Sequence, residues 1–196
     1  MGHSLTPELA DHRQQFRDNR SAAHELCNPL TREAFNWRPS EGRRSVAECL
    51  SHLVVSGKLY SDAILHAAQA ARAARRVGTG PFRYGLLSRM MLRSLDPQNR
   101  RRFKAPRKFA PPPTESAIEP VLEALDSALD RWEHCLEISD GLDLARVKIT
   151  SPELPLLRFQ LGATFAMQAM HERRHLQQAR AVTTAPAFPA STLEDS

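Results

Sequence analysis

The segment that decides the fold is residues 45–53, which read SVAECLSHL in one-letter code. Its first four residues form a capping box, in which the side chains of Ser45 and Glu48 accept hydrogen bonds from each other's free backbone amides at a helix start. Apolar residues then follow at intervals of three and four, which is the spacing of a buried helix face. The segment therefore predicts a long helix over residues 45–75, which ends before the glycines and proline of residues 78–81.

The same apolar spacing predicts more helices on both sides of this one. Thr6 is the expected cap of the first helix, with Pro7 at its first helical position, and Thr114 is the expected cap of the third long helix. A short run of β-branched residues at 147–150 does not repeat, so no sheet of consequence is expected. The predicted long helices cover residues 6–27, 45–75, 114–139 and 160–182, and a short extra helix covers residues 84–95.

Four amphipathic helices can bury their apolar stripes only against one another. The predicted fold is therefore all-α, a four-helix bundle with a short extra helix in the connector between its second and third long helices. The connections over residues 76–113 and 140–158 are long, which favours one or two crossovers. We expect a single domain over residues 1–182 and a disordered tail over residues 183–196.

Composition narrows the expected location of the protein. No apolar run approaches the about 18 residues of a membrane span, and no signal peptide is evident. The three cysteines are odd in number and widely spaced, which is typical of reduced thiols rather than of a disulfide framework. We therefore expect a cytoplasmic protein with no membrane partner.

Positive charge is concentrated in one segment. The chain carries a net charge of +5, but residues 72–108 alone hold twelve Arg and Lys residues and a single acid, Asp96. Such a block can meet nucleic acid, an anionic membrane or an acidic substrate, or it can be a solvated connector. No nucleic-acid-binding motif accompanies it, so we favour the connector and expect no nucleic-acid partner.

Residues 171–175, which read HERRH, carry the strongest chemical signal in the chain. His171 and His175 are four residues apart in a predicted helix and so lie on the same face. Two imidazoles in this arrangement can bind one divalent ion, and three protein ligands leave a fourth position open for chemistry. The pattern also matches zinc peptidases, but Ala181 stands where the extended motif needs a third His, and the acids further downstream lie at the chain end. We therefore reject the peptidase interpretation.

A third ligand must come from elsewhere in the chain. Among the eight histidines, His52, His171 and His175 are the three in mid-helix positions near an apolar stripe. Cys49 lies one turn from His52 and can ligate a metal, but small buried thiols commonly only pack, so we leave it out. The other five histidines are interpreted as surface residues: His3, His12, His24, His66 and His134.

Glu172 follows the first histidine of the pair directly. It lies about 100° around the helix from His171, so it need not face a metal. It is therefore a partner that orients a ligand, a general base or a surface ion-pair residue. The surface role is the one that we expect.

Several stretches taken together resemble DinB-like proteins. Trp37-Arg38-Pro39 and residues 44–53 resemble the start of the second helix of that family. The resemblance covers nearly the whole chain. It extends to residues 103–111 and 140–144, which look like connectors of one branch of the family, and to residues 161–162 and 171–179.

The resemblance implies a bundle in up-down-down-up order with a three-His metal centre. One ligand comes from the second helix of the family and two come from a His-x-x-x-His pair in the fourth, and His52, His171 and His175 fill these positions. Many relatives carry Trp where this chain has Arg44. We expect that departure to affect packing near the helix start without disturbing the ligands.

The resemblance also implies a function. Characterised relatives include metal-dependent S-transferases that use low-molecular-weight thiols, and a thiol-dependent isomerase. The chain is therefore expected to be a metal-dependent transferase of the thiol S-transferase type, with zinc or nickel at the three histidines and an open position for a thiolate. It would act on a small-molecule substrate, and an arginine of residues 72–108 is a candidate to hold the carboxylates of the thiol.

Two alternatives use the same ligands. One is a metal-dependent hydrolase that activates water, and the other is a non-catalytic, metal-stabilised binding or stress-response module. Relatives are often homodimers, and the apolar residues of 82–95 exceed what a connector needs. We therefore expect a homodimer.

Overall fold

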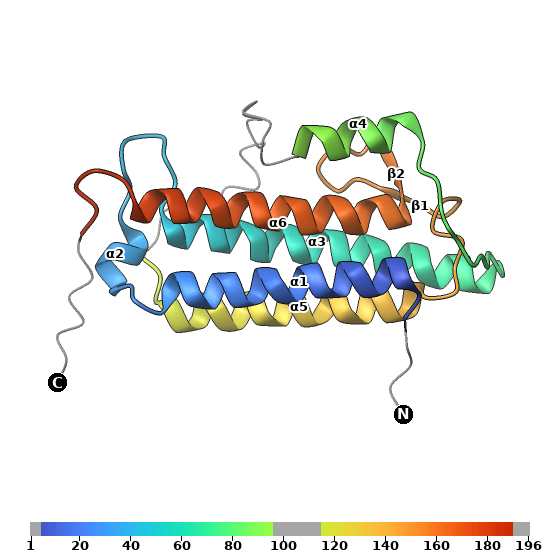
Figure 1. The fold of residues 1–196 in the computed structure, drawn as a ribbon, viewed down its shortest axis with the longest axis horizontal. Helices are drawn as coiled ribbons and strands as arrows, with labels where there is room; N and C mark the ends of the chain where they lie inside the picture. Colours follow the sequence, from blue (N-terminus) through green and yellow to red (C-terminus); the bar gives the residue numbers. More distant parts are fainter. Residues whose placement is uncertain (1–4, 96–114, 190–196) are drawn as a thin grey trace.

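The computed structural model describes residues 5–95 and 115–189, which form a bundle of long helices (Figure 1). The prediction of an all-α fold is confirmed, because the sheet found among the described residues is a single two-stranded hairpin. The elements are α1 (Pro7–Cys27), α2 (Arg32–Asn36), α3 (Val46–Ala73), α4 (Leu86–Leu95), α5 (Ile118–Ser139), β1 (Lys148–Thr150), β2 (Arg158–Gln160) and α6 (Leu161–Thr183).

The four long helices α1, α3, α5 and α6 form a square bundle. Helix α3 packs against α5 and α6, and α1 packs against the same two helices, so α1 and α3 are diagonal to each other. Helices α1 and α6 run in one direction, and α3 and α5 run in the opposite direction (Figure 1). This arrangement places the first turns of α3 beside the middle of α6, where the candidate ligands lie.

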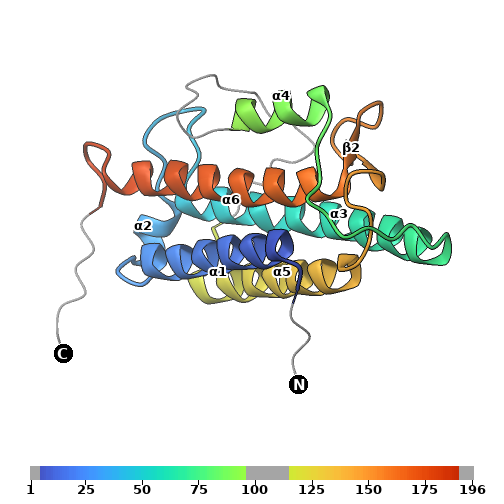
Figure 2. The same cartoon turned by 45° about the vertical axis from the view of Figure 1, so that its right-hand side comes forward.

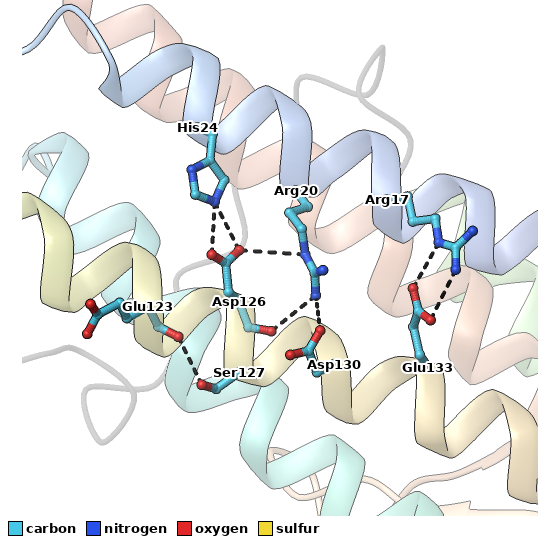
Figure 3. Close-up of polar contacts among 8 residues, drawn as sticks. All are labelled: Arg17, Arg20, His24, Glu123, Asp126, Ser127, Asp130 and Glu133. Carbon is cyan, nitrogen blue, oxygen red and sulfur yellow. Dashed lines mark hydrogen bonds and ion pairs between the residues drawn. The ribbon is translucent and has the colours of Figure 1, made fainter.

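Ion pairs along one edge of the bundle define the register of α1 against α5 (Figure 3). Successive positions of α1 meet successively earlier positions of α5, so the two helices are antiparallel. These pairs are at least partly solvent-exposed, and each stabilises the fold by only about 0–1 kcal/mol. They are Arg17–Glu133, Arg20–Asp130 and His24–Asp126.

The core between the helices is aromatic at its centre. The fully buried ring of Trp132 stacks on Phe16, with ring centroids 5.2 Å apart and planes inclined by 9°. The indole nitrogen of Trp132 donates a hydrogen bond to Glu172, so a polar residue of α6 is held inside the core. The core therefore combines stacking with a buried polar contact.

Two helix starts show which cap predictions held. The capping box of α3 is confirmed, because Ser45 Oγ accepts from the Glu48 amide at 3.1 Å and Glu48 Oε2 accepts from the Ser45 amide at 2.9 Å. At α1, however, Thr6 makes no side-chain cap bond. Its backbone amide donates instead to Asp140 Oδ1 at 3.0 Å, which ties the start of α1 to the end of α5.

Helix α5 begins later than the predicted start at residue 114. Thr114 itself lies outside the described residues, and residues 115–117 are not helical. Helix α5 starts at Ile118, which places Pro120 in its first turn. A proline lacks an amide hydrogen, and only in the first turn does the helix lose no hydrogen bond by it.

The short helix α2 and the hairpin of β1 and β2 were not predicted, and helix α4 begins two residues later than predicted. The short helix α2 is capped by Thr31, whose Oγ1 accepts from the Ala34 amide at 3.2 Å. Residues 140–158 contain β1, which pairs antiparallel with β2, with Ile149 opposite Phe159. Helix α4, expected over residues 84–95, covers Leu86–Leu95 and lies on α6 and β2 (Figure 2).

The segment that leads into α4 is fixed by a close contact. The Tyr84 hydroxyl donates to the Glu8 carboxylate and passes directly over Gly162 in the first turn of α6. A Cβ at Gly162 would overlap with the tyrosine oxygen, so a larger residue there would displace the Tyr84 side chain. This contact holds α4 against the α6 side of the bundle.

The predicted disordered tail begins at residue 183, and the structure describes the first part of it. Phe188 packs edge-on against Trp37, with ring centroids 5.5 Å apart. Residues 190–196 lie outside the described residues. No described helix is long and apolar enough to cross a membrane.

Candidate metal centre

Three histidines from two helices converge between α3 and α6. His52 lies two turns into α3, and His171 and His175 occupy successive turns of α6. One ring nitrogen from each lies within 4.8 Å of the others, and no other group of three possible metal ligands was found among residues 5–95 and 115–189. The ring centroids are 4.5–5.3 Å apart. The structure therefore brings the three sequence-predicted ligands together.

The separation of the three nitrogens suits one metal ion. Tetrahedral zinc with bonds of about 2.1 Å requires ligand nitrogens about 3.4 Å apart. Small rotations of the imidazoles reach that spacing from a separation of at most 4.8 Å. Zinc, nickel and copper all accept imidazole ligands, so the donor set fits a divalent transition metal and does not distinguish among them.

Unsatisfied ring nitrogens support the same assignment. The Nδ1 atoms of His171 and His175 are buried and have no hydrogen-bond partner in the structure. A buried polar atom without a partner costs free energy, so native proteins rarely leave one unless a water, an ion or a ligand completes it. Two such atoms in one cluster favour a binding site over a structural hydrogen-bond network.

The surroundings of His171 and His175 keep both imidazoles in the neutral form that binds metal. The pKa of His171 is lowered to about 3, mainly by burial, and the neighbouring His52, Arg44 and Arg174 contribute to the same shift. The pKa of His175 is also lowered well below its usual value, mainly by burial. A neutral imidazole carries the lone pair that a metal binds, so a proton does not compete for these nitrogens near neutral pH.

Among the described residues, the arginines that act on the site are not those of the basic segment, whose residues 96–108 lie outside the described part of the chain. Arg44 and Arg174 lie outside residues 72–108, and their charges lower the pKa of both His171 and His175. Arg174 also donates to the Ser94 carbonyl at 3.1 Å, which ties α6 to the end of α4. The Arg44 departure from the family pattern therefore affects the electrostatics of the ligands and not only the packing.

Glu172 does not lie on the surface, and this expectation is wrong. Its side chain is 4% exposed and faces α1 and α5. Its two carboxylate oxygens accept from Asn19 Nδ2 at 3.1 Å and from Trp132 Nε1 at 2.8 Å. Burial raises its pKa to about 8, although both hydrogen bonds act in the opposite direction. The rotation of about 100° from His171 turns this carboxyl group away from the metal ligands.

His12 is the second residue whose predicted exposure is wrong. It is 6% exposed and lies against Phe165 of α6, and neither ring nitrogen has a hydrogen-bond partner. Burial lowers its pKa, while Glu8 and Asp11 act to raise it. No cluster of possible ligands forms around it in the described part of the chain. His12 is therefore a core residue of the interface between α1 and α6.

Cys49 is buried and takes no part in the histidine cluster. Its pKa is raised to about 12 by burial, so it is a neutral thiol near pH 7.

A small cavity opens beside the cluster. It has a volume of about 70 Å³, and His171 forms part of its wall. Helix α4 covers it with Met91 and Leu95, and α3 contributes Ser56. Ser56 and Gln168 were not among the predicted site residues, although their spacing from the histidines indicates that they lie near the site. Ser56 is four residues after His52 and Gln168 is three residues before His171, so each shares a helix face with a ligand.

Comparison with known proteins assigns the chain to a family. Searches of curated proteins and of solved structures found no match to this chain. The family model of the DinB superfamily matches residues 15–179, a range that includes all of α3 and all three histidines. Since this match covers most of the 196 residues, the chain belongs to the DinB superfamily.

Proposed function

We propose that His52, His171 and His175 bind one divalent metal ion, zinc or nickel, and that the protein transfers a low-molecular-weight thiol to a small electrophile. The observation that carries the proposal is the convergence of three imidazoles, two of which have unpartnered buried nitrogens, beside a cavity. A bound divalent ion supplies a Lewis-acid centre that favours the thiolate form of a thiol.

The charges around the cluster favour an anionic ligand. Arg44 and Arg174 add positive charge, and Glu172 is turned away and bonded to Asn19 and Trp132. The three ligands are neutral, so they leave the charge of a divalent ion uncompensated. A thiolate, or a thiol that also carries carboxylates, would compensate that charge. These two arginines are therefore better placed than the described arginines of residues 72–95 to hold such carboxylates.

The proposed reaction is a nucleophilic displacement or addition at carbon. A lone pair of the thiolate sulfur forms the new sulfur–carbon bond, and in a displacement the leaving group departs with the electrons of the bond that breaks. The thiol proton is released to solvent. The burial of His171 and His175 keeps both imidazoles neutral and so unable to donate that proton back.

Two alternatives use the same three histidines. A hydrolase would use the open position for water, and Glu172 is then a poor general base, because its carboxylate is directed toward α1 and α5 and bonded to Asn19 and Trp132. A non-catalytic binding or stress-response module would need only the metal. No geometric feature favours either alternative over the transferase.

The test is a thiol-dependence assay. Metal-loaded protein is incubated with a halo-aromatic electrophile and a panel of thiols, some with carboxylates and some without. The proposal expects consumption that requires both metal and thiol and prefers the carboxylate-bearing thiols. Activity that needs metal but is indifferent to thiol would favour the hydrolase, and no turnover with a filled site would favour the binding module.

A variant pair locates the anionic group. Arg174→Gln should raise the KM for a carboxylate-bearing thiol and leave the KM for a neutral thiol unchanged. The exposed Arg89 of α4 provides the matched control, Arg89→Gln, which should behave as the wild type. If Arg89→Gln raised this KM and Arg174→Gln did not, the carboxylates would be assigned to residues 72–108 instead.

A further inference from the structure

The cavity beside the histidines lies between α3, α6, α4 and the β-hairpin. Its volume of about 70 Å³ is enough for a few non-hydrogen atoms. Its wall runs from His171 to Leu154 in the loop between β1 and β2, and Leu154 is 46% exposed. The cavity therefore joins the candidate ligands to the surface beside that loop.

Most of the wall is apolar. Met91 and Leu95 of α4 form the cover, and Phe159 and Met167 belong to a small hydrophobic cluster with α4 packed on it. An apolar wall favours an apolar ligand, because binding removes both surfaces from water. The size of that ligand is limited by the two α4 side chains.

One hydroxyl group in this wall is left without a partner. Ser56 is 1% exposed, and its hydroxyl has no hydrogen-bond partner. A serine within a helix commonly bonds to the carbonyl four residues earlier, and Ser56 does not. Its hydroxyl is therefore available to a molecule in the cavity.

The neighbouring polar groups differ from Ser56. The Tyr60 hydroxyl and Ser151 Oγ are 3.0 Å apart and bonded to each other, and Ser151 Oγ also accepts from the Leu154 amide. Gln168 is 5% exposed and lies on the α6 wall. Glu153 is the acidic residue of the lining, which disfavours a second anion in the cavity. Ser56 on α3 and Gln168 on α6 are thus the residues that can make a polar contact with an uncharged group of a molecule in the cavity.

We infer that this cavity holds the small electrophilic substrate of the proposed transfer. The substrate is uncharged and mainly apolar, and it carries one hydrogen-bond-accepting oxygen that receives the Ser56 hydroxyl. Ser56 lies one turn from His52, so this contact orients the substrate relative to the ligands. Met91 and Leu95 set its length. The inference rests on the proposed function for the metal, but its test can fail separately.

The test measures binding and not turnover. The protein is loaded with cobalt(II), whose visible spectrum reports the ligand set, and titrated with alkyl hydroxamates that anchor on the metal. Butanoyl and 3-oxobutanoyl hydroxamates are equal in length and differ by one carbonyl oxygen. Octanoyl hydroxamate tests the length limit.

Wild-type protein should bind the 3-oxobutanoyl probe about threefold to tenfold more tightly than the butanoyl probe, the effect of one hydrogen bond. Ser56→Ala should abolish that preference without changing the cobalt spectrum. Ser127→Ala, an exposed serine on α5, should keep it. Equal preference in wild type and Ser56→Ala would overturn the role of Ser56 and indicate that a water satisfies the hydroxyl.

Leu95→Ala tests the cover without touching Ser56. It should raise the affinity for octanoyl hydroxamate about tenfold, because the longer chain gains buried surface. The control is Met90→Ala on the same helix, since Met90 is 57% exposed and does not line the cavity. Equal octanoyl affinity in both variants would overturn the length limit.

The cobalt spectrum separates the two proposals. If it develops in wild type but not in His171→Ala, the metal site stands, and the hydroxamate results decide the cavity alone. If wild type and His171→Ala give the same spectrum, the metal site and this inference both fall. A cobalt site without thiol-dependent turnover would remove the transferase while leaving the hydroxamate results valid.

Discussion

Helix α6 presents two polar clusters on different faces, and they differ in how their buried atoms are satisfied. Toward α3, His171 and His175 meet His52, and the two α6 residues keep unpartnered Nδ1 atoms. Toward α1 and α5, Glu172 accepts one hydrogen bond on each carboxylate oxygen. The first cluster adjoins a cavity, and Glu172 does not line it.

This difference separates a site from a structural network. Both clusters bury polar groups, and burial is the main reason that the pKa values of His171 and of Glu172 depart from their usual values. A shifted pKa therefore does not identify the functional cluster here. The convergence of unpartnered nitrogens does, because a native core rarely leaves such atoms without a ligand, an ion or water that completes them.

The largest expected effect is on metal content. His171→Ala should bind metal more than about 100-fold more weakly, because it removes a direct ligand and not only a supporting contact. Wild-type protein purified without chelator or an affinity tag should carry about one ion per chain by elemental analysis. His134→Ala, at an exposed position, is the control. Equal metal in wild type and His171→Ala would remove the distinction between the two clusters.

Glu172 should show the reverse pattern, a loss of stability without a loss of metal. Glu172→Gln keeps one acceptor but sets an NH₂ group against either Asn19 or Trp132. A buried donor left without an acceptor costs about 1–3 kcal/mol, measured by urea unfolding. Glu137→Gln on the exposed side of α5 should change stability little. If Glu172→Gln lost metal and kept its stability, Glu172 would belong to the metal site.

His12 is a buried histidine without a hydrogen-bond partner that lies outside the three-His cluster, so it tests whether such a residue affects only stability. Burial lowers its pKa, so below about pH 6.5 the unfolded chain takes up a proton that the folded chain does not. Stability should therefore fall as the pH drops below 6.5, by up to about 1.4 kcal/mol per pH unit from this residue. His12→Leu should reduce that slope in chelator-treated protein and leave metal binding intact.

The control for this slope is His134→Leu, in which an exposed histidine is removed. Because both variants keep the three-His cluster, its contribution to the pH dependence cancels in the comparison. An unchanged slope in His12→Leu would mean that Glu8 and Asp11 offset the effect of burial on the pKa of His12.

The smallest effect concerns the two faces of α4. Its inner face covers the cavity, while Leu86, Leu87 and Met90 remain 44–65% exposed on its outer face. If that face joins two copies, light scattering should give twice the 22.0 kDa of the chain, and Leu87→Glu with Met90→Glu should return it to a single chain. Leu156→Glu, at a residue that is 98% exposed, is the control. A wild-type mass near 22.0 kDa would refute the dimer.

Local rules account for the parts of the fold that could be predicted. The capping box at Ser45 and the spacing of apolar residues depend on neighbours within one or two turns, so α3 and the other long helices were predicted closely. The pairing of His171 with His175 is local in the same sense. His52 was placed beside them by its mid-helix position and by the family resemblance, not by any local rule.

The amino-acid sequence by itself determined the helices, the bundle and which histidines share a face. Only the tertiary structure decided what each remaining face meets. The sequence placed Glu172 about 100° from His171 but not against Asn19 and Trp132, and it did not show that α4 covers Ser56. The physical reason is that backbone geometry fixes directions around one helix, whereas burial depends on the packing of helices that lie far apart in the chain.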